Sequence, residues 1–502
     1  MPGQLTINPR RAGASLKVVV VGGGLAGIAT AFTLQRAGHN VTVVERTDGK
    51  ARSHGGIRSP PNMTRVLTSW GLGPALAKLA VRCRQFLFHQ PDGELLGLVQ
   101  LHEDFLVDLM GDFIFIQHGD LQSMLLDLAT HEGVQFRYNC TVESVDTENI
   151  GVVVVGGERF DADFVVGAEG PESLVRTAVM THQITGYADG PNSLVRTAAD
   201  EHITGYADGH LSLTMAIPTD VMREDKDLRT LADEGNWWVW LGPSTLIHGS
   251  LVSGRKEFTV VIGLQGVPPE TLAKYDESWD KSYPIEHFGI DFSTYDIRVQ
   301  KLMKLVKKVT PTVHIRRPIL ESSVCHLARL VIVGEAAHPL VPAGQHNAGL
   351  AMEDAETLGA LFTRIQHRSQ VQRVLAGFEE IRQPRCNYAQ NWELRKRIMM
   401  SAPLGPEQKK RDEGIRRMAA NFDWEHIDET RFREMWGDEM EMFCHSSTEA
   451  VEDWWAKWGS LLARDMARDT ATGAAPAKSE VPSTPTMQVN VSTGQQRSMI
   501  VY

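Results

Sequence analysis

The chain has 502 residues, of which 42% are hydrophobic and 23% charged, and its formal net charge is −11. This composition is typical of a globular protein with two or three domains, and the negative charge argues against nucleic acid or an anionic membrane as partner. No apolar run reaches the roughly 18 residues of a membrane span, and the first residues lack the apolar core of a secretory signal. We therefore expect a cytoplasmic protein. Its five cysteines lack metal-binding spacing and predict reduced thiols and no metal site.

The first predicted unit, residues 17–46 (KVVVVGGGLAGIATAFTLQRAGHNVTVVER), is a strand, a glycine-rich turn, a helix, a second strand and an acidic end. Gly22 permits the tight turn, Gly24 lets the backbone approach a pyrophosphate, and Gly27 lets the helix pack closely on the sheet. This order of elements is typical of a dinucleotide site.

The two ends of this unit suit the two ends of a nucleotide. Leu25 and Ala26 begin the helix, where free N–H groups and the positive dipole end attract phosphates. Glu45, followed by Arg46, lies about twenty residues past the turn, where a carboxylate can accept hydrogen bonds from a ribose diol. The segment leaves FAD and NAD(P) open, and a glycine-rich turn in an ordinary α/β domain is the alternative.

The rest of the chain mixes predicted helices and strands. Helices are predicted from near residue 62, at 119–132, at 348–367, and onward to about 466. Strands are predicted within 84–116, at 134–140, 151–155 and 163–167, in an antiparallel sheet over 210–300, and at 330–333. The last residues, rich in Ala, Thr, Ser, Pro and Gln, indicate a disordered tail. The fold class is therefore α/β with an additional sheet domain and a C-terminal helical region.

One segment is repeated almost directly. Residues 171–190 (PESLVRTAVMTHQITGYADG) are followed by 191–209 (PNSLVRTAADEHITGYADG). A single short repeat does not indicate a solenoid. We interpret it as a local tandem duplication that leaves one copy as a surface insertion.

Later motifs complement the first unit: HGGIRSPPNMTRVLTSWGL from residue 54, FIQHGDL from 115, VVGAEGPESLVR from 165 and GEAAHPLVPAGQHNAGLAMEDA from 334. Together with the glycine fingerprint they resemble the single-component (class A) FAD-dependent aromatic monooxygenases, the group of p-hydroxybenzoate and salicylate hydroxylases, and most closely its fungal-type branch. The likeness covers roughly residues 15–390. It carries the G-A-G-I…P-N-A-x-R-x-L stretch, the D-G motif and the G-D-A-A-H-x-x-x-P motif of that group.

The chain departs from the group at three positions. Glu169 and Glu335 stand where the D-G and G-D motifs have aspartate, and His118 stands where an arginine is expected. The duplication offers a rival D-G motif with Asp189 in YADGPNSLVR (187–196), which leads into the second copy. We prefer Glu169 because only the first copy follows an apolar strand.

The resemblance implies a Rossmann-like (GR2-type) FAD-binding domain, a β-sheet substrate domain and C-terminal helices. The implied boundaries are 15–82, 113–180 and 311–390 for the three FAD-binding parts, 83–112 and 210–310 for the substrate domain, 181–209 for the duplication, 391–466 for the helices and 467–502 for the tail. The implied FAD-binding residues are Gly22, Gly24, Leu25, Ala26, Gly27, Glu45, Arg46, Gly55, Gly56, His118, Glu169, Gly170, Gly334, Glu335, Pro342, Ala348 and Gly349.

The chemistry implied is hydroxylation of a small aromatic acid or phenol by NAD(P)H and O2 through a C4a-hydroperoxyflavin, with or without loss of a ring carboxylate, in secondary metabolism. The helix from Ala348 would direct N–H groups at the reduced flavin anion, and Pro342 would stiffen the loop beside the ring. His248 is a candidate phenol-activating base, with Tyr206 a weaker candidate. Trp237, Trp238 and Trp240 fall in the substrate sheet, where core packing is the alternative role.

Other functions stay open from the sequence. An epoxidase or ring-opening oxygenase uses the same fold, and a flavin-free binding protein resembling the GDP-dissociation inhibitors shares the glycine fingerprint. NAD(P)H is expected to dock transiently because no second nucleotide-binding unit is visible. A monomer or a homodimer is expected.

Overall fold

The structure is a computed structural model that describes residues 11–51, 55–185, 205–275, 281–317, 320, 322–325, 329–420 and 429–472. The chain forms two compact units, Met1–Trp454 and Trp455–Tyr502, and the elements described below belong to the first unless stated. Among the described residues, no helix is both long enough and apolar enough to cross a membrane.

A six-stranded sheet forms the core of the nucleotide-binding part. Its order is β18-β19-β12-β1-β2-β8, parallel except for β18. The strands are β1 (Lys17–Val21), β2 (Asn40–Val44), β8 (Gln135–Arg137), β12 (Phe164–Gly167), β18 (Val324–Cys325) and β19 (Leu330–Ile332). The valine runs of β1 and β12 are buried, as expected for parallel strands covered on both faces.

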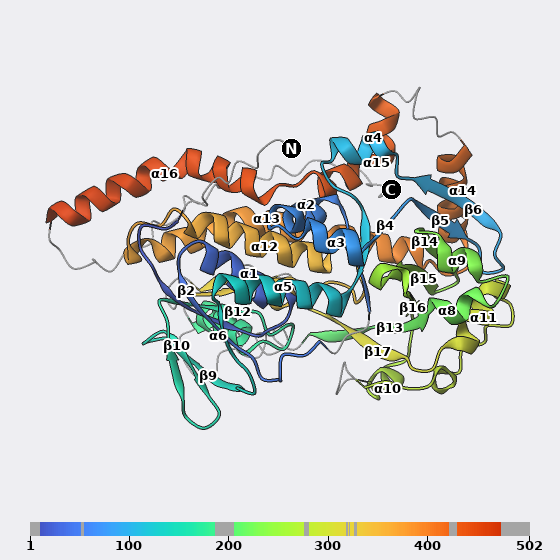
Figure 1. The fold of residues 1–502 in the computed structure, drawn as a ribbon, viewed down its shortest axis with the longest axis horizontal. Helices are drawn as coiled ribbons and strands as arrows, with labels where there is room; N and C mark the ends of the chain where they lie inside the picture. Colours follow the sequence, from blue (N-terminus) through green and yellow to red (C-terminus); the bar gives the residue numbers. More distant parts are fainter. Residues whose placement is uncertain are drawn as a thin grey trace, which may run out of the picture. The chain divides into compact units, whose positions relative to one another are not determined.

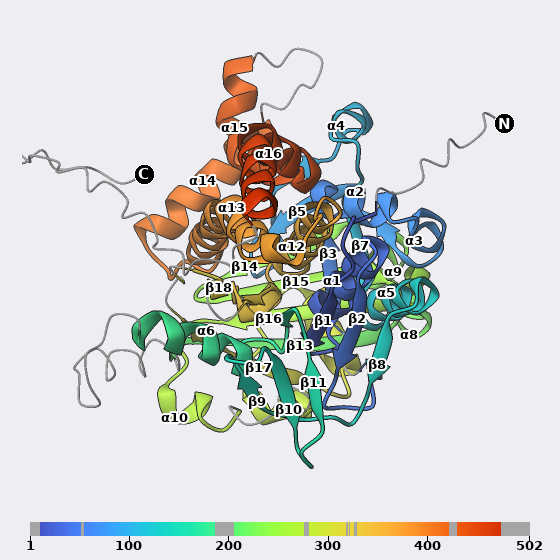
Figure 2. The same cartoon turned by 90° about the vertical axis from the view of Figure 1, so that its left-hand side faces the viewer.

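Helices and a small sheet cover this core. Helix α1 (Leu25–Arg36) packs against α5 (His118–Glu132) and α12 (Asn347–Phe362). Valines of β1 and β12 also share a hydrophobic cluster with a three-stranded sheet and with α6 (Leu174–Thr185). That sheet consists of β9 (Val142–Asp146), β10 (Gly151–Val154) and β11 (Arg159–Asp161), which stand together at the lower edge of Figure 2.

A seven-stranded sheet in the order β17-β13-β16-β15-β14-β5-β6 forms the substrate part. It is antiparallel except where β5 pairs with β14. The strands are β5 (Gln85–His89), β6 (Leu95–Gln100), β13 (Tyr206–Pro218), β14 (Trp237–Gly242), β15 (Thr245–Val252), β16 (Glu257–Leu264) and β17 (Thr310–Arg316). Short helices α8 (Thr219–Arg223), α9 (Arg229–Asp233), α10 (Pro269–Leu272) and α11 (Ile297–Leu305) lie beside it in Figure 1.

A small antiparallel sheet connects the two parts. It contains β3 (Gly56–Ser59), β7 (Ile114–Gln117) and β4 (Val81–Arg82), and it is followed or flanked by α2 (Pro61–Ser69), α3 (Gly73–Leu79) and α4 (Glu103–Asp108). The C-terminal helices are α13 (Val371–Met400), α14 (Pro406–Ala420), α15 (Glu429–Phe443) and α16 (Ser447–Thr472), the last of which continues into the second unit. Helix α13 packs along α12 (Figure 1).

The predicted fold class is confirmed, while several element ends differ. The span 84–116 was expected to hold only strands, but α4 interrupts it because Glu103 and Asp104 favour a helix N-terminus and Phe105 and Leu106 are buried. Helix α12 ends at Phe362 rather than at residue 367. The domain boundaries stay predictions. Residues 186–204 of the duplication, including Asp189, and the tail after Thr472 lie outside the described residues.

Candidate active site

The glycine turn after β1 shows which glycines the fold itself requires. Gly22 has φ +101°, and a Cβ there would lie 2.5 Å from the Ala168 carbonyl oxygen. A Cβ on Gly27 would lie 1.9 Å from the Gly22 oxygen, so the helix packs on the turn only without a side chain. Gly24 differs, because nothing lies within 4 Å of its Cβ position. The open space in front of Gly24 is therefore a cradle for a ligand group.

The start of α1 is suited to an anion. Its N-cap, Gly24, has no side-chain hydrogen bond, and the first turn contains no acidic residue, so the amides of Leu25 and Ala26 are open to phosphate. Glu45 is held beside them: its Oε2 accepts from the Gly23 N–H at 2.6 Å and its Oε1 from the Thr47 N–H at 2.7 Å. Each carboxylate oxygen keeps a lone pair for a ribose diol. These residues fit the ADP end of FAD.

Arg46 is exposed on the strand end beside Glu45. Gly55 and Gly56 lie next to the start of α5, because Gly56 pairs with Gln117 and the His118 N–H donates to the Gly55 carbonyl at 2.9 Å. Among the described residues the His118 Nδ1 has no hydrogen-bond partner. Burial lowers the pKa of His118 to about 4, so this ring is neutral where an arginine was expected.

Glu169 follows β12 and turns toward its own helix. Its carboxylate accepts from the Ser173 hydroxyl and from the Val175 N–H at 3.3 Å, so it caps the start of α6. Burial raises the pKa of Glu169, and the bonds from Ser173 and Val175 oppose that shift. Gly170, with φ +84° and nothing within 4 Å of its Cβ position, adjoins open space.

The loop after β19 lies between the N-terminus of α1 and that of α12. Gly334 has φ +60°, and a Cβ there would lie 2.6 Å from the Ala26 Cβ, so the loop lies against the first turn of α1. The Gly334 N–H donates to Asp354 Oδ2 at 2.8 Å. Glu335 is exposed and accepts from the Asn347 amide at 3.4 Å, which places its carboxylate beside the start of α12.

Half-buried Pro342 lies in a tight turn before α12. The Val341 carbonyl accepts from the Gly344 N–H at 2.9 Å and from the Asn347 amide at 3.1 Å, and Ala343 has φ +54°. The α12 N-cap has no side-chain hydrogen bond and its first turn no acid, so the amides at Ala348 and Gly349 form a second positive helix end. Such an end stabilises an anion, as the reduced flavin ring would be.

Opposite this turn lies a group that we call the Arg58 cluster: Arg58, Trp237, His248 and Ala343. The Arg58 guanidinium donates to the Ala343 carbonyl and lies 4.8 Å from the centroid of the Trp237 ring. Trp237 contacts His248 edge to face at 5.6 Å. Strand β3, strands β14 and β15, and the Pro342 turn therefore meet at one place.

The charges in this cluster are unbalanced. Arg58 forms no ion pair among the described residues; burial lowers its pKa to about 10, and the more distant Glu393 opposes the shift. Burial, and then the charge of Arg58, hold the pKa of His248 well below its usual value, so this ring is neutral. Glu393 accepts from the His346 N–H at 2.7 Å, and its pKa is raised by burial. A cation in these surroundings favours an anionic ligand.

Arg58 and Glu393 were not among the site residues predicted from the sequence. Arg58 stands within the GGIRSPPN stretch, so its neighbours were identified without it. Conversely, Tyr206 is 59% exposed at the start of β13, where its backbone pairs with Arg316. The structure does not place Tyr206 in the Arg58 cluster, and its catalytic role stays a prediction.

The three tryptophans of β14 separate between two faces. Trp237 packs with Phe86, Phe88, Leu340 and Leu350 on the side of α12, whereas Trp238 and Trp240 belong to the core on the other side of the sheet. The period of two in a strand causes this separation. Only Trp237 faces the Arg58 cluster, and core packing, the alternative role, holds for the other two.

Residues 15–187 match the family of FAD binding domains. The chain is similar to the FAD-dependent monooxygenase OpS4 of Beauveria bassiana (strain ARSEF 2860), 27% identical over 403 residues that cover 80% of this chain and 89% of the relative. It is also similar to a 3-amino-4-hydroxybenzoate 2-monooxygenase of Streptomyces cremeus, 28% identical over 417 residues that cover 82% and 94% of the two chains.

Solved structures show the same fold. A salicylate hydroxylase substrate complex has a TM-score of 0.66 at 17% identity, covering 87% of this chain and 97% of the other. CtdE in complex with FAD and a substrate has a TM-score of 0.68 at 17% identity, covering 89% and 100%. The predicted resemblance and the predicted cofactor are confirmed, and the flavin-free binding protein is set aside. The chain therefore has an FAD-binding domain at residues 15–187 and the fold of salicylate hydroxylase, and over most of its length it is similar to FAD-dependent monooxygenases.

Proposed function

We propose that the protein uses NAD(P)H and O2 to hydroxylate a small aromatic acid or phenol. The observation that carries this proposal is the Arg58 cluster, in which a cation without an ion-pair partner among the described residues lies over an aromatic ring. A carboxylate or phenolate would pair with Arg58, and an aromatic ring would pack against Trp237. The curated relative named for 3-amino-4-hydroxybenzoate supports the same chemical class.

The residues divide the work between two ends of the cofactor. The α1 N-terminus and Glu45 would hold the ADP end, and the amides at Ala348 and Gly349 would face the flavin ring. Bound FAD supplies the redox chemistry that activates oxygen. The buried face formed by Phe86, Phe88 and Trp237 would keep water from the reacting atoms.

Arg58 and His248 would share the activation of the substrate. The guanidinium stabilises negative charge on the phenol oxygen and so makes the ring more electron-rich. The neutral imidazole of His248 can accept a hydrogen bond from a substrate hydroxyl, although its lowered pKa makes it a weak base. The charge of Arg58 is therefore the larger contribution.

The test is substrate-stimulated NAD(P)H oxidation by the FAD-loaded protein with a panel of aromatic acids and phenols, followed by mass analysis for addition of one oxygen atom. Loss of a charge-assisted hydrogen bond costs about 1.5–3 kcal/mol, so Arg58→Gln should raise KM roughly tenfold to a hundredfold. Arg58→Lys should recover part of this loss.

Arg298→Met is the matched control, because Arg298 lies 5.4 Å from the Trp238 ring on the other face of the sheet. It should leave KM unchanged. FAD-loaded protein that no aromatic acid or phenol stimulates, or an unchanged KM in Arg58→Gln, would refute the proposal. An epoxidised or ring-opened product would favour those alternative oxygenases on the same fold.

A further inference from the structure

A buried carboxylate on α13, that of Glu393, contacts the turn of residues 341–347 that leads into α12. Glu393 is 6% exposed, and its Oε1 accepts from the His346 N–H at 2.7 Å. A Cβ on Gly344 would lie 3.3 Å from the Glu393 Cδ, so the carboxyl group also lies against the middle of the turn. The proposed hydroxylation assigns no role to Glu393.

The bond from His346 takes the place of a capping box. In that motif the third residue of a helix is a glutamate or glutamine, and its side chain accepts from the N–H of the N-cap residue. His346 is the N-cap of α12, but the third residue of this helix is Gly349, which has no side chain. Glu393 supplies the acceptor from another helix instead. The start of α12 is thereby held while its amides at Ala348 and Gly349 stay open.

The turn needs anchors because its backbone is strained. Ala343 has φ +54°, a left-handed conformation that a residue with a side chain keeps only where its surroundings hold it. Arg58 donates to the Ala343 carbonyl from β3, and Glu393 accepts from the His346 N–H further along the turn. Two distant segments of the chain therefore hold the short connection that places α12.

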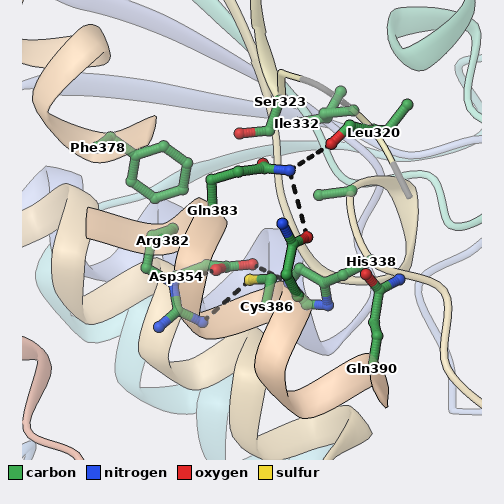
Figure 3. Close-up of a pocket in the computed structure, with 12 residues that line it drawn as sticks. Leu320, Ser323, Ile332, His338, Asp354, Phe378, Arg382, Gln383, Cys386 and Gln390 are labelled. Carbon is green, nitrogen blue, oxygen red and sulfur yellow. Dashed lines mark hydrogen bonds and ion pairs between the residues drawn. The ribbon is translucent and has the colours of Figure 1, made fainter. Parts of the chain in front are cut away.

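Buried ion pairs fix α13, which carries Glu393, against α12. Arg382 Nε donates to Asp354 Oδ1 at 2.7 Å, and Arg382 Nη1 donates to Glu353 Oε2 at 2.7 Å. Figure 3 shows Arg382 of α13 beside Asp354 of α12. Glu393 lies about three helical turns after Arg382 and, like it, on the buried side of α13. The ion pairs therefore fix the height at which the Glu393 carboxylate meets the turn.

A charge effect of Glu393 is the competing role. Burial raises the pKa of Glu393, while the charge of Arg58 and the bond from His346 oppose that shift. An anionic Glu393 beside the α12 N-terminus would partly cancel the positive helix end and so disfavour a second anion there. The hydrogen bond would instead favour that anion by keeping the helix end in place, and a protonated carboxyl group can still accept it. The two roles predict opposite changes when Glu393 is replaced.

We propose that Glu393 is a positioning residue for the bound FAD: through the His346 N–H it fixes the start of α12, so that the amides at Ala348 and Gly349 stay directed at the flavin ring. The inference rests on the proposed function, in which the ring lies before this helix end. The helix end stabilises the anion that the reduced ring carries. Loss of the hydrogen bond should therefore weaken the binding of reduced FAD more than that of oxidised FAD.

The experiment measures the reduction potential of the flavin in the FAD-loaded protein, by anaerobic equilibration with a reference dye. Glu393→Gln and Glu393→Met are the decisive pair, because both side chains are neutral and similar in size but only glutamine can accept from the His346 N–H. Relative to Glu393→Gln, Glu393→Met should lower the ratio of the affinities for reduced and oxidised FAD about threefold to thirtyfold, which is a fall of about 15–45 mV for a two-electron couple. Glu393→Gln should match the wild type or exceed it, because it keeps the acceptor without the charge.

Two more variants complete the test. Gln383→Met is the matched control, because it removes an amide on the same helix that donates to the Leu320 carbonyl, away from the turn (Figure 3); it should leave the potential unchanged. Glu393→Asp keeps the charge but withdraws the acceptor by one methylene group, so its potential should fall below that of the wild type. It tests the proposal if Glu393→Met does not fold. Hydrogen exchange of the peptide that contains His346 should be faster in Glu393→Met than in Glu393→Gln.

Equal potentials in Glu393→Gln and Glu393→Met would overturn the proposal, because these variants then differ from the wild type through charge alone. A fall of the same size in Gln383→Met would overturn it too, because general loosening of α13 would explain both. The measurement uses neither an aromatic substrate nor NAD(P)H. A failure of the proposed hydroxylation would therefore leave the result for Glu393 unchanged, and the KM test of Arg58 does not depend on Glu393.

Discussion

Gly24→Ala and Gly27→Ala should separate cofactor binding from folding within a single turn. Gly24 has φ −78° and ψ −175°, which alanine adopts freely, and no atom lies within 4 Å of its Cβ position. Alanine is a less favourable N-cap than glycine, which destabilises the fold, but it also reduces the entropy of the unfolded chain, which stabilises the fold. Because these effects nearly cancel, the stability of the apoprotein should change by less than about 1 kcal/mol. In Gly27→Ala the new Cβ would lie 1.9 Å from the Gly22 backbone oxygen, and such overpacking costs roughly 1–3 kcal/mol.

FAD affinity should show the opposite sensitivity. The methyl group of Gly24→Ala would occupy the space through which a pyrophosphate approaches the α1 amides. The resulting steric clash should cost roughly 1–3 kcal/mol of binding free energy, which raises the Kd for FAD roughly 5-fold to 150-fold. Apoprotein thermal unfolding and flavin fluorescence titration measure the two effects separately. A Gly24→Ala protein that binds FAD with wild-type affinity, or whose apoprotein is as destabilised as that of Gly27→Ala, would show that the cradle is wrongly placed.

Two further predictions concern titration and capping. Burial lowers the pKa of His89 to about 4, whereas the same histidine in the unfolded chain has a pKa of 6.5. Below pH 6.5 the unfolded chain is therefore protonated first, and at pH 5 this costs about 2 kcal/mol of stability. His89→Gln should reduce the fall in the thermal unfolding midpoint between pH 7 and pH 5, and an undiminished fall would refute this assignment. Glu169→Ala should remove the cap of α6 and so lower the unfolding free energy of the apoprotein by about 1 kcal/mol, with little change in FAD affinity. A large loss of FAD affinity at unchanged stability would mean that Glu169 contacts the cofactor directly.

The nucleotide-binding half of the site was predictable because its signals are local. A strand, a glycine turn and a helix adjoin in the sequence, so Gly22, Gly24 and Gly27 were assigned distinct roles that their surroundings in the structure match. The two faces of β14 follow from the same kind of local rule. Alternation in a strand alone separates Trp237 from Trp238, although the sequence does not show which face meets α12.

The rest depends on contacts between distant segments. Arg58 meets Ala343 across 285 positions of the chain, and no local pattern marks such a pair. The direction of the Glu169 carboxylate depends on Ser173 and Val175, from which it accepts hydrogen bonds. Helix α4 was missed because six residues provide too little periodicity to override the alternation around them.

The departures from the expected motifs have a common physical consequence. His118 is neutral where an arginine was expected, Glu169 is engaged by its own helix, and Arg46 is exposed. Among the described residues these side chains therefore contribute little positive charge at the nucleotide turn. The N-terminus of α1 supplies positive potential there, and that of α12 would face the flavin ring. Backbone dipoles act over one helical turn only, so the position of the loop that carries Gly334 matters more than any single charge.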